Sequence, residues 1–208
     1  MNLEDYITAH SDVEPDYLAK LNRVTHLRTI NPRMLSGHFQ GRVLAMFCHM
    51  LQPKVVLELG TFTGYSALSM AEGMPEDGIL HTIDCDDELE DFLNETFANS
   101  EHGHKIKLHI GDALTEIGKL NETLDLVFID ADKREYLAYY EAVLPKVRMG
   151  GFILTDNTLW DEKVLKPVDP KDKDTVAIMQ FNDFIAADNR IQKVLLPIRD
   201  GLTLIRKK

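Results

Sequence analysis

The sequence has few cysteines, no long apolar run and no concentration of basic residues. Its two cysteines, Cys48 and Cys85, form neither a disulfide framework nor a metal-ligand spacing, which predicts buried or idle thiols in a reducing compartment. No apolar run approaches the roughly 18 residues that span a bilayer, so a membrane partner is not expected. The net charge of −11, without a basic stripe, argues against a nucleic-acid partner.

Targeting segments and internal boundaries are also missing. The first 18 residues are acidic and polar and lack the basic start and apolar middle of a signal peptide, which predicts a cytoplasmic protein. The 208 residues contain no repeat, low-complexity tract or Pro/Gly-rich linker. We therefore expect one domain, residues 1–208, that is long enough to bury a full core.

Two phosphate-binding motifs are absent. There is no G-x-x-x-x-G-K-[ST] sequence, which excludes a P-loop. The dinucleotide fingerprint G-x-G-x-x-G fails at Gly60, because Phe62 and Tyr65 stand where its second and third glycines would be. This argues against a nicotinamide oxidoreductase, an alternative that a simple NAD-binding test would exclude.

Regular structure is indicated along the whole chain. A first helix is expected to start near Asp12 or Glu14–Pro15, and a second to run from Ser36 to Leu51. The apolar face of the second helix is expected to hold Phe39, Val43, Leu44, Phe47 and Leu51. Short apolar runs then alternate with amphipathic stretches at 64–73, 87–100, 112–119 and 133–147; the runs are 55–60, 79–84, 105–110, 124–130 and 151–156.

This alternation predicts an α/β fold with an open parallel sheet and helices on both faces. A last helix is expected near 174–188. Two further apolar runs, 190–197 and 202–207, flank an Asp-Gly turn signal at Asp200–Gly201 and predict a C-terminal antiparallel hairpin. A seven-stranded sheet that ends in such a hairpin differs from a plain dinucleotide-binding sheet.

Ligands of open α/β sheets bind beyond the carboxyl ends of the strands. Four of the five parallel strands end at or beside an acid, and the strand-end positions are Glu58–Gly60, Asp84, Gly111–Asp112, Asp130 and Asp156. A single acid there can simply cap a helix or lie in a solvated loop. Four acids at one edge favour a binding site.

The segment ELGTFTGYS, residues 58–66, fits a cofactor without a pyrophosphate. Gly60 permits a sharp turn, and Gly64 lets backbone approach a ligand. S-adenosylmethionine is such a cofactor. Asp84 can accept hydrogen bonds from both ribose hydroxyls. The alternative role for Asp84 is an N-cap for the next helix, for which Asp86 or Asp87 is better placed.

The segments FIDADKREY and ILTDN bring hard oxygen donors to neighbouring strand ends. Asp130, Asp156 and Asn157 together suit Mg²⁺, which takes few protein ligands and keeps open positions for substrate. Lys133 lies one short turn after Asp130, close enough to act on a metal-bound hydroxyl. Asp156-Asn157 alone would also fit a turn. Tyr136, together with Trp160, is a candidate for the substrate mouth, with core packing as the alternative.

These motifs resemble those of the class I, cation-dependent O-methyltransferases of the caffeoyl-CoA and catechol type. The resemblance runs from about Ser36 to the C-terminus through ELGTFTGYS, IDCDDE, GDA, FIDADKREY and GGFILTDNTLW, and the pair FIDADK and DNTLW is highly specific. It implies a Rossmann-like methyltransferase fold in which the helices of residues 1–52 cover the cofactor and substrate side. It also implies a homodimer.

The resemblance implies roles for individual residues. Lys133 and Asp130 would be catalytic, with Lys133 as the base. A divalent ion, Mg²⁺ with Mn²⁺ or Ca²⁺ as alternatives, would be bound by Asp130, Asp156 and Asn157. S-adenosylmethionine would be bound by Ser36, Glu58, Gly60, Thr61, Ser66, Asp84, Ala113 and Asp130.

The substrate implied is a small catechol-like diol. Plant caffeoyl-CoA enzymes have an Asn that contacts substrate where this chain has Asp161, and their coenzyme A-gripping residues have no match here. The chain looks more like the short bacterial branch of the family. The alternatives are a non-catalytic S-adenosylmethionine-binding protein and a metal-independent methyltransferase with another acceptor.

Overall fold

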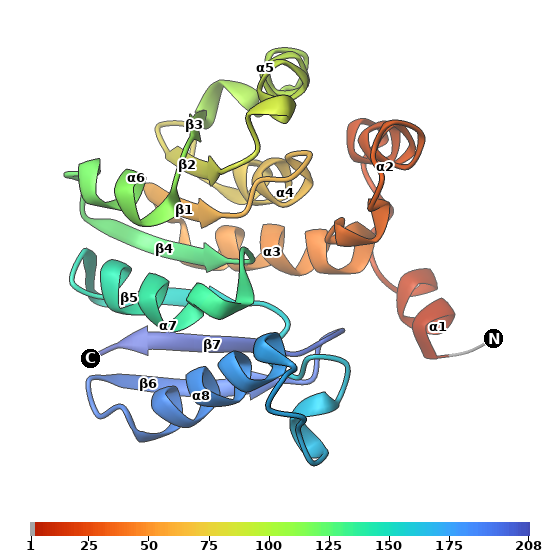
Figure 1. Cartoon of the computed structure of the whole chain (residues 1–208). Helices are drawn as coiled ribbons and strands as arrows, with labels where there is room; N and C mark the ends of the chain where they lie inside the picture. Colours follow the sequence, from red (N-terminus) through yellow and green to blue (C-terminus); the bar gives the residue numbers. More distant parts are fainter. Residues whose placement is uncertain (1–2) are drawn as a thin grey trace. The chain divides into compact units, whose positions relative to one another are not determined.

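The computed structural model describes residues 3–208, so the first two residues of the expected 1–208 domain lie outside the described residues (Figure 1). The chain divides into two compact units. One consists of residues up to 54 together with 61–110, and is called the N-terminal unit. The other consists of residues 55–60 and 111–208, and is called the C-terminal unit.

The chain forms a seven-stranded sheet with the strand order β3-β2-β1-β4-β5-β7-β6. Only β7 runs antiparallel to its neighbours, β5 and β6. The predicted α/β class, with its mostly parallel sheet and closing C-terminal hairpin, is therefore confirmed. Among residues 3–208, no helix is both long and apolar enough to span a membrane.

The C-terminal unit contains five of the strands. They are β1 (Val55–Leu59), β4 (Leu124–Ile129), β5 (Val147–Thr155), β6 (Ile191–Leu196) and β7 (Leu202–Lys207). Three helices follow one another along one side of these strands in Figure 1, and α7 contacts both its helical neighbours and β4. They are α6 (Ala113–Lys119), α7 (Tyr136–Val143) and α8 (Lys173–Ala187), with single 3₁₀ turns at Lys133–Glu135 and Lys163–Leu165.

The central strands of this unit are buried on both faces. Successive residues of a strand point to opposite faces of the sheet. Val56 and Leu57 on β1, and Leu126 and Val127 on β4, all have no exposed surface, so both faces are covered. Apolar runs of this kind are what a parallel sheet covered on both sides requires. Strand β6 is different, because residues 192–195 are all exposed.

The N-terminal unit holds the other two strands, β2 (Ile79–Asp84) and β3 (Ile106–Ile110), which pair in parallel. Helix α4 packs against both of them, and α5 packs against β3. The helices of this unit are α1 (Leu3–Ala9), α2 (Asp16–Arg28), α3 (Gly37–Leu51), α4 (Tyr65–Gly73) and α5 (Glu90–Ala98), and its 3₁₀ turns are Pro32–Met34, Asp87–Leu89 and Gly103–Lys105.

The predicted apolar face of α3 is wrong in detail. Its buried residues are Gln40, Gly41, Leu44, Ala45 and Cys48, and only Leu44 belongs to the predicted face. The reason is close packing of α3 on α4. A Cβ at Gly41 would lie 2.8 Å from Ser69 Oγ, so small residues set the contact where periodicity favoured the larger apolar ones.

Candidate active site

The parallel strands of the C-terminal unit end level with one another. Leu59 pairs with Ile129, and Ile129 pairs with Thr155. The next residues continue the ladder: Asp130 N donates to Leu59 O at 2.9 Å, and Asp156 N donates to Ile129 O at 3.0 Å. The register therefore puts Asp130 and Asp156 at the ends of adjacent strands, as the sequence predicts.

Gly60 follows the adjacent strand at the same edge. Its φ of +95° is strained for any residue with a side chain. A Cβ at this position would come within 2.1 Å of the carbonyl oxygen of Asp130. A glycine is therefore required here for two reasons, the backbone turn and the close approach of the Asp130 segment.

Lys133 lies between two partners within the C-terminal unit. Its Nζ is 2.7 Å from Asp130 Oδ1 and 2.8 Å from the hydroxyl oxygen of Tyr136. The lysine and aspartate side chains are only 13% and 19% exposed, so the pair is partly shielded from water. The predicted neighbours Asp130 and Lys133 are thus brought together, through the 3₁₀ turn that starts at Lys133.

Tyr136 is a core residue, so of its two predicted places, the substrate mouth and the core, the structure shows the core. The side chain has no exposed surface, and its hydroxyl lies within hydrogen-bond distance of the carbonyl oxygens of Ile129 and Asp156. Burial raises the pKa of Tyr136 well above 10, and the charges of Asp130 and Asp156 raise it further. The phenol therefore stays protonated and helps to hold the lysine in place.

Asp156 and Asn157 lie where β5 turns into the following loop. Asp156 is 3% exposed, and its Oδ1 accepts a hydrogen bond from Asn157 N at 2.8 Å. Asn157 adopts φ +56°, a left-handed conformation that Asn tolerates better than most residues. Its Nδ2 donates to Asp200 Oδ2 at 3.4 Å. Asp200 comes from the β6–β7 turn and was not expected at the site.

The donor chemistry of this edge fits a hard divalent ion. Within residues 3–208, no three His, Cys, Asp or Glu side chains form a group that could hold a metal. The predicted set is of another kind, because its third ligand is the amide of Asn157. Carboxylate and amide oxygens suit Mg²⁺, and a carboxylate as buried as Asp156 favours a nearby positive charge.

Residues 60–64, between β1 and α4, form a turn with a glycine at each end, which we call the glycine turn. From Thr61 onward it belongs to the N-terminal unit. Asp84 Oδ2 accepts a hydrogen bond from Phe62 N at 2.7 Å, and its Oδ1 accepts one from Asp86 N at 3.0 Å. The N-cap of the following turn is Asp86, whose side chain accepts from Glu88 N. The capping alternative for Asp84 is therefore not observed, and this carboxylate instead braces the turn.

The other predicted cofactor residues of this unit are largely buried. Ser66 lies in the first turn of α4 and is 6% exposed, while Ser36 is 7% exposed and precedes α3. The Thr61 hydroxyl lies 2.5 Å from that of Thr82 on β2. A further bond, from Thr25 Oγ1 to Thr63 Oγ1 at 2.9 Å, fastens α2 to the turn, and no motif in the sequence indicates it.

The remaining predicted positions lie in the C-terminal unit. Glu58 is fully buried in β1. Asp112 is the N-cap of α6 and accepts hydrogen bonds from the backbone and hydroxyl of Thr115 at 2.8 and 2.6 Å. Ala113 is the first residue of that helix and is half-buried. The acid of the GDA segment therefore has a capping role, which leaves the backbone at Ala113 as the candidate contact.

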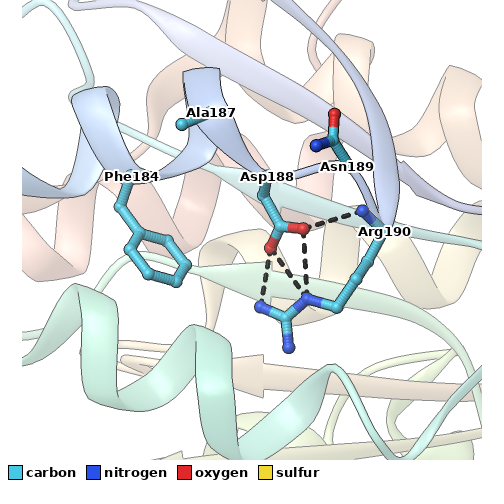
Figure 2. Close-up of a pocket in the computed structure, with 5 residues that line it drawn as sticks. All are labelled: Phe184, Ala187, Asp188, Asn189 and Arg190. Carbon is cyan, nitrogen blue, oxygen red and sulfur yellow. Dashed lines mark hydrogen bonds and ion pairs between the residues drawn. The ribbon is translucent and has the colours of Figure 1, made fainter.

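A pocket of about 310 Å³ lies elsewhere in the C-terminal unit (Figure 2). It is lined by Phe184, Ala187, Asp188, Asn189 and Arg190, and Figure 2 shows the Asp188–Arg190 ion pair at its wall. The pocket is at the start of β6, whereas Asp156 follows the end of β5, and these strands run in the same direction. It is therefore at the opposite end of the sheet from the strand-end acids.

A family model, curated relatives and solved structures all match this chain to O-methyltransferases. The O-methyltransferase family model matches residues 8–208. A caffeoyl-CoA O-methyltransferase of Petroselinum crispum is 34% identical over 93% of this chain and 85% of its own length.

Solved structures agree with this result. The SAH-bound methyltransferase PaMTH1 of Podospora anserina is 27% identical, with a TM-score of 0.91 over 99% of this chain and 94% of its own. The O-methyltransferase TomG of Streptomyces achromogenes, involved in tomaymycin synthesis and solved in complex with SAM, is 25% identical, with a TM-score of 0.90 over 99% and 96%.

This chain belongs to the O-methyltransferase family. The predicted family, the Rossmann-like methyltransferase fold and the enzyme class, an S-adenosylmethionine-dependent O-methyltransferase, are confirmed.

Proposed function

We propose that this protein transfers the methyl group of S-adenosylmethionine to one hydroxyl of a small catechol-like diol, with the help of a divalent cation. The observation that carries the proposal is the register that sets Asp130 and Asp156 at adjacent strand ends, with Lys133 paired to Asp130. The bond between the methyl carbon and the sulfonium breaks as a carbon–oxygen bond forms, and the hydroxyl proton passes to a base.

The cofactor would be bound by the residues that the sequence singles out. They are Ser36, Glu58, Gly60, Thr61, Ser66, Asp84, Ala113 and Asp130. Asp84 already accepts two backbone hydrogen bonds, one on each oxygen. A carboxylate oxygen has a second lone pair, so both oxygens can still accept from ribose hydroxyls.

The metal would be held by Asp130, Asp156 and Asn157, with Mg²⁺ as the expected ion and Mn²⁺ or Ca²⁺ as alternatives. When bound, the ion would lower the pKa of the diol hydroxyls and fix their orientation. Two carboxylates and a neutral amide leave positions open for both oxygens of a diol, which a monophenol would use only in part.

Lys133 would be the general base. It is within 2.7 Å of Asp130 and 2.8 Å of Tyr136, so its amine is held in one place at the edge where the substrate would lie. A cation held by Asp130 would compete with the Lys133 side chain for this carboxylate.

The enzyme is expected to act on its substrate without a macromolecular partner other than a second copy of itself. The partner is a small molecule, and neither nucleic acid nor a membrane is expected for an acidic chain of this composition. We propose a cytoplasmic homodimer, with residues 1–208 acting as a single functional domain.

The decisive experiment measures transfer of labelled methyl from S-adenosylmethionine to a matched panel of catechols and monophenols, with Mg²⁺ and with excess EDTA. Label transfer that requires both the vicinal diol and the metal supports the proposal. Transfer that persists in EDTA refutes the metal and favours the metal-independent alternative. Tight cofactor binding without transfer to any diol favours the non-catalytic alternative.

A further inference from the structure

The loop after β5 is fastened to the β6–β7 turn at four points. Leu159 N donates to Asp200 O at 2.8 Å, and Thr158 N donates to Gly201 O at 3.0 Å. The carboxylate of Asp200 supplies the other two contacts. Its Oδ2 accepts from Asn157 Nδ2 at 3.4 Å, and its Oδ1 accepts from Asp161 N.

The β6–β7 turn can approach the loop after β5 this closely because position 201 is a glycine. Gly201 has φ +88°, and a Cβ there would lie 2.6 Å from Leu159 N. The hydroxyls of Thr203 and Thr158, both buried, are 2.9 Å apart just beyond the turn. A side chain at position 201 would push the turn away and pull Asp200 from the loop.

The loop held in this way has an unfavourable backbone. Trp160, Asp161 and Glu162 adopt φ values of +50°, +53° and +56°, which residues with side chains rarely adopt, and least often consecutively. Asn157, at the start of the loop, has φ +56°. A strained segment persists only where the surrounding structure determines it, and Asp200 contacts this loop at Asn157, Leu159 and Asp161.

The carboxylate of Asp200 also determines which atom of the Asn157 amide faces it. A carboxylate can accept from the Nδ2 of Asn157 but not from its Oδ1, because both are hydrogen-bond acceptors. The amide is therefore turned so that Oδ1 points away from Asp200. A metal-binding Asn must present its oxygen, and with Nδ2 on Asp200 the Oδ1 atom stays available for that role.

We propose that Asp200 is a positioning residue, which orients the Asn157 amide for a divalent ion and holds the loop up to Asp161 against the site. This inference rests on the metal of the proposed function. Asp200 itself is not a ligand in this proposal: it acts through Asn157 and through the backbone of Asp161. Partners of this kind, beyond the ligands themselves, commonly affect metal affinity tenfold or more.

The test is Mn²⁺ binding to the purified full chain, followed by the electron paramagnetic resonance signal of free Mn²⁺. Asp200→Asn removes the charge and one acceptor oxygen, and we expect about tenfold weaker Mn²⁺ binding with unchanged cofactor affinity. Asp183→Asn makes the same charge change at an exposed position on α8 and should bind Mn²⁺ as the wild type does. Wild-type Mn²⁺ affinity in Asp200→Asn overturns the inference.

A double-mutant cycle separates positioning from a general loss of structure. If Asp200 acts through Asn157, Asp200→Asn should have little further effect on Mn²⁺ affinity in an Asn157→Ala background. Equal effects in both backgrounds would overturn the inference, and would do so even if Asp200→Asn is less stable. A wild type that binds no Mn²⁺ would refute the metal of the proposed function, and the inference would fall with it.

Discussion

Lys133 and Asp130 form a partly buried ion pair, with 2.7 Å between Nζ and Oδ1, at the end of strand β4. They are close neighbours in sequence, and a third group also contacts the lysine. The phenol of Tyr136 accepts from the same ammonium at 2.8 Å and is itself held by backbone carbonyl oxygens of the strand ends. The lysine is thus fixed by a core tyrosine, at the edge where we propose that the substrate binds.

Substitution of Lys133 should act on the chemical step. Lys133→Ala removes the proposed base, and we expect kcat to fall by about 10²- to 10⁴-fold with a much smaller change in KM for the diol. Steady-state kinetics with a catechol at saturating cofactor measures this. Tyr136→Phe, which keeps the lysine but removes one of its acceptors, should show a milder fall in kcat. An unchanged kcat in Lys133→Ala would assign proton removal to solvent.

Removal of the Asp156 carboxylate should abolish the metal-dependent activity. In Asp156→Ala we expect metal-dependent turnover to fall by more than about 100-fold, which exceeds the usual effect of outer-shell partners. Cofactor affinity, measured by calorimetry, should stay near the wild-type value because Asp156 is not among the proposed cofactor residues. If the variant retains full activity, with or without EDTA, the metal assignment is wrong.

Gly60 and Gly118 offer a matched pair for stability. Gly60→Ala forces a side chain onto φ +95° and against the Asp130 carbonyl, so we expect the free energy of unfolding to fall by more than about 2 kcal/mol. Gly118 lies in α6, where an added Cβ would meet no atom within 4 Å, and Gly118→Ala should raise that free energy by about 0.5–1 kcal/mol. Urea unfolding of both variants checks the opposite signs.

Glu72 should contribute to stability in a pH-dependent way. It accepts two hydrogen bonds from Arg42, at 2.8 and 2.6 Å, and one from Tyr17 at 2.9 Å. Burial alone would raise the pKa of Glu72, but the bonds from Arg42 and Tyr17 and the charge of Arg42 outweigh it, so the pKa is lowered. A lowered pKa means that the stabilisation is complete above the unfolded value of about 4.3 and is lost as the pH falls through the folded value.

We therefore expect Glu72→Gln to lower the free energy of unfolding at pH 7 by about 1–3 kcal/mol. The difference from wild type should shrink below about pH 4, where the wild-type carboxylate is also protonated. Denaturant unfolding between about pH 3 and pH 7 measures this, with the exposed Glu88→Gln as the control for charge. A difference that does not depend on pH would contradict an ionic origin.

The hydrogen bond from Thr25 on α2 to Thr63 should stabilise the glycine turn more than it stabilises α2. Both hydroxyls are fully buried, and Thr25→Val leaves that of Thr63 without this partner, which should cost about 1–3 kcal/mol. We also expect weaker cofactor binding, because the turn is proposed to hold the cofactor. Thr29→Val, which loses only a bond from its hydroxyl to Thr25 O, is the control and should leave cofactor affinity unchanged.

The sequence alone determined the elements and the order of the site residues. Buried strands are short apolar runs and the helices between them are amphipathic, so the predicted ranges of β1 and β4, for example, agree with the observed ones to within one residue. Because parallel strands end at one edge, the alternation of strands and helices is enough to place the acids at 130 and 156 together. Gly60 and Gly64 indicate a turn in the sequence, because glycine is the residue that readily adopts the positive φ values observed at both positions.

Tertiary structure decided what depends on contacts between distant segments. Nothing in the periodicity of α3 reveals that Gly41 packs on Ser69, because helix packing is set by the shape of the partner surface. Asp200 and Gly201 read as a turn in sequence, and only the pairing of β7 with β5 brings Asp200 to Asn157, 43 residues away. Tyr136 likewise has two possible places on sequence grounds, and its burial beside Lys133 follows from the fold of the chain rather than from its neighbours in sequence.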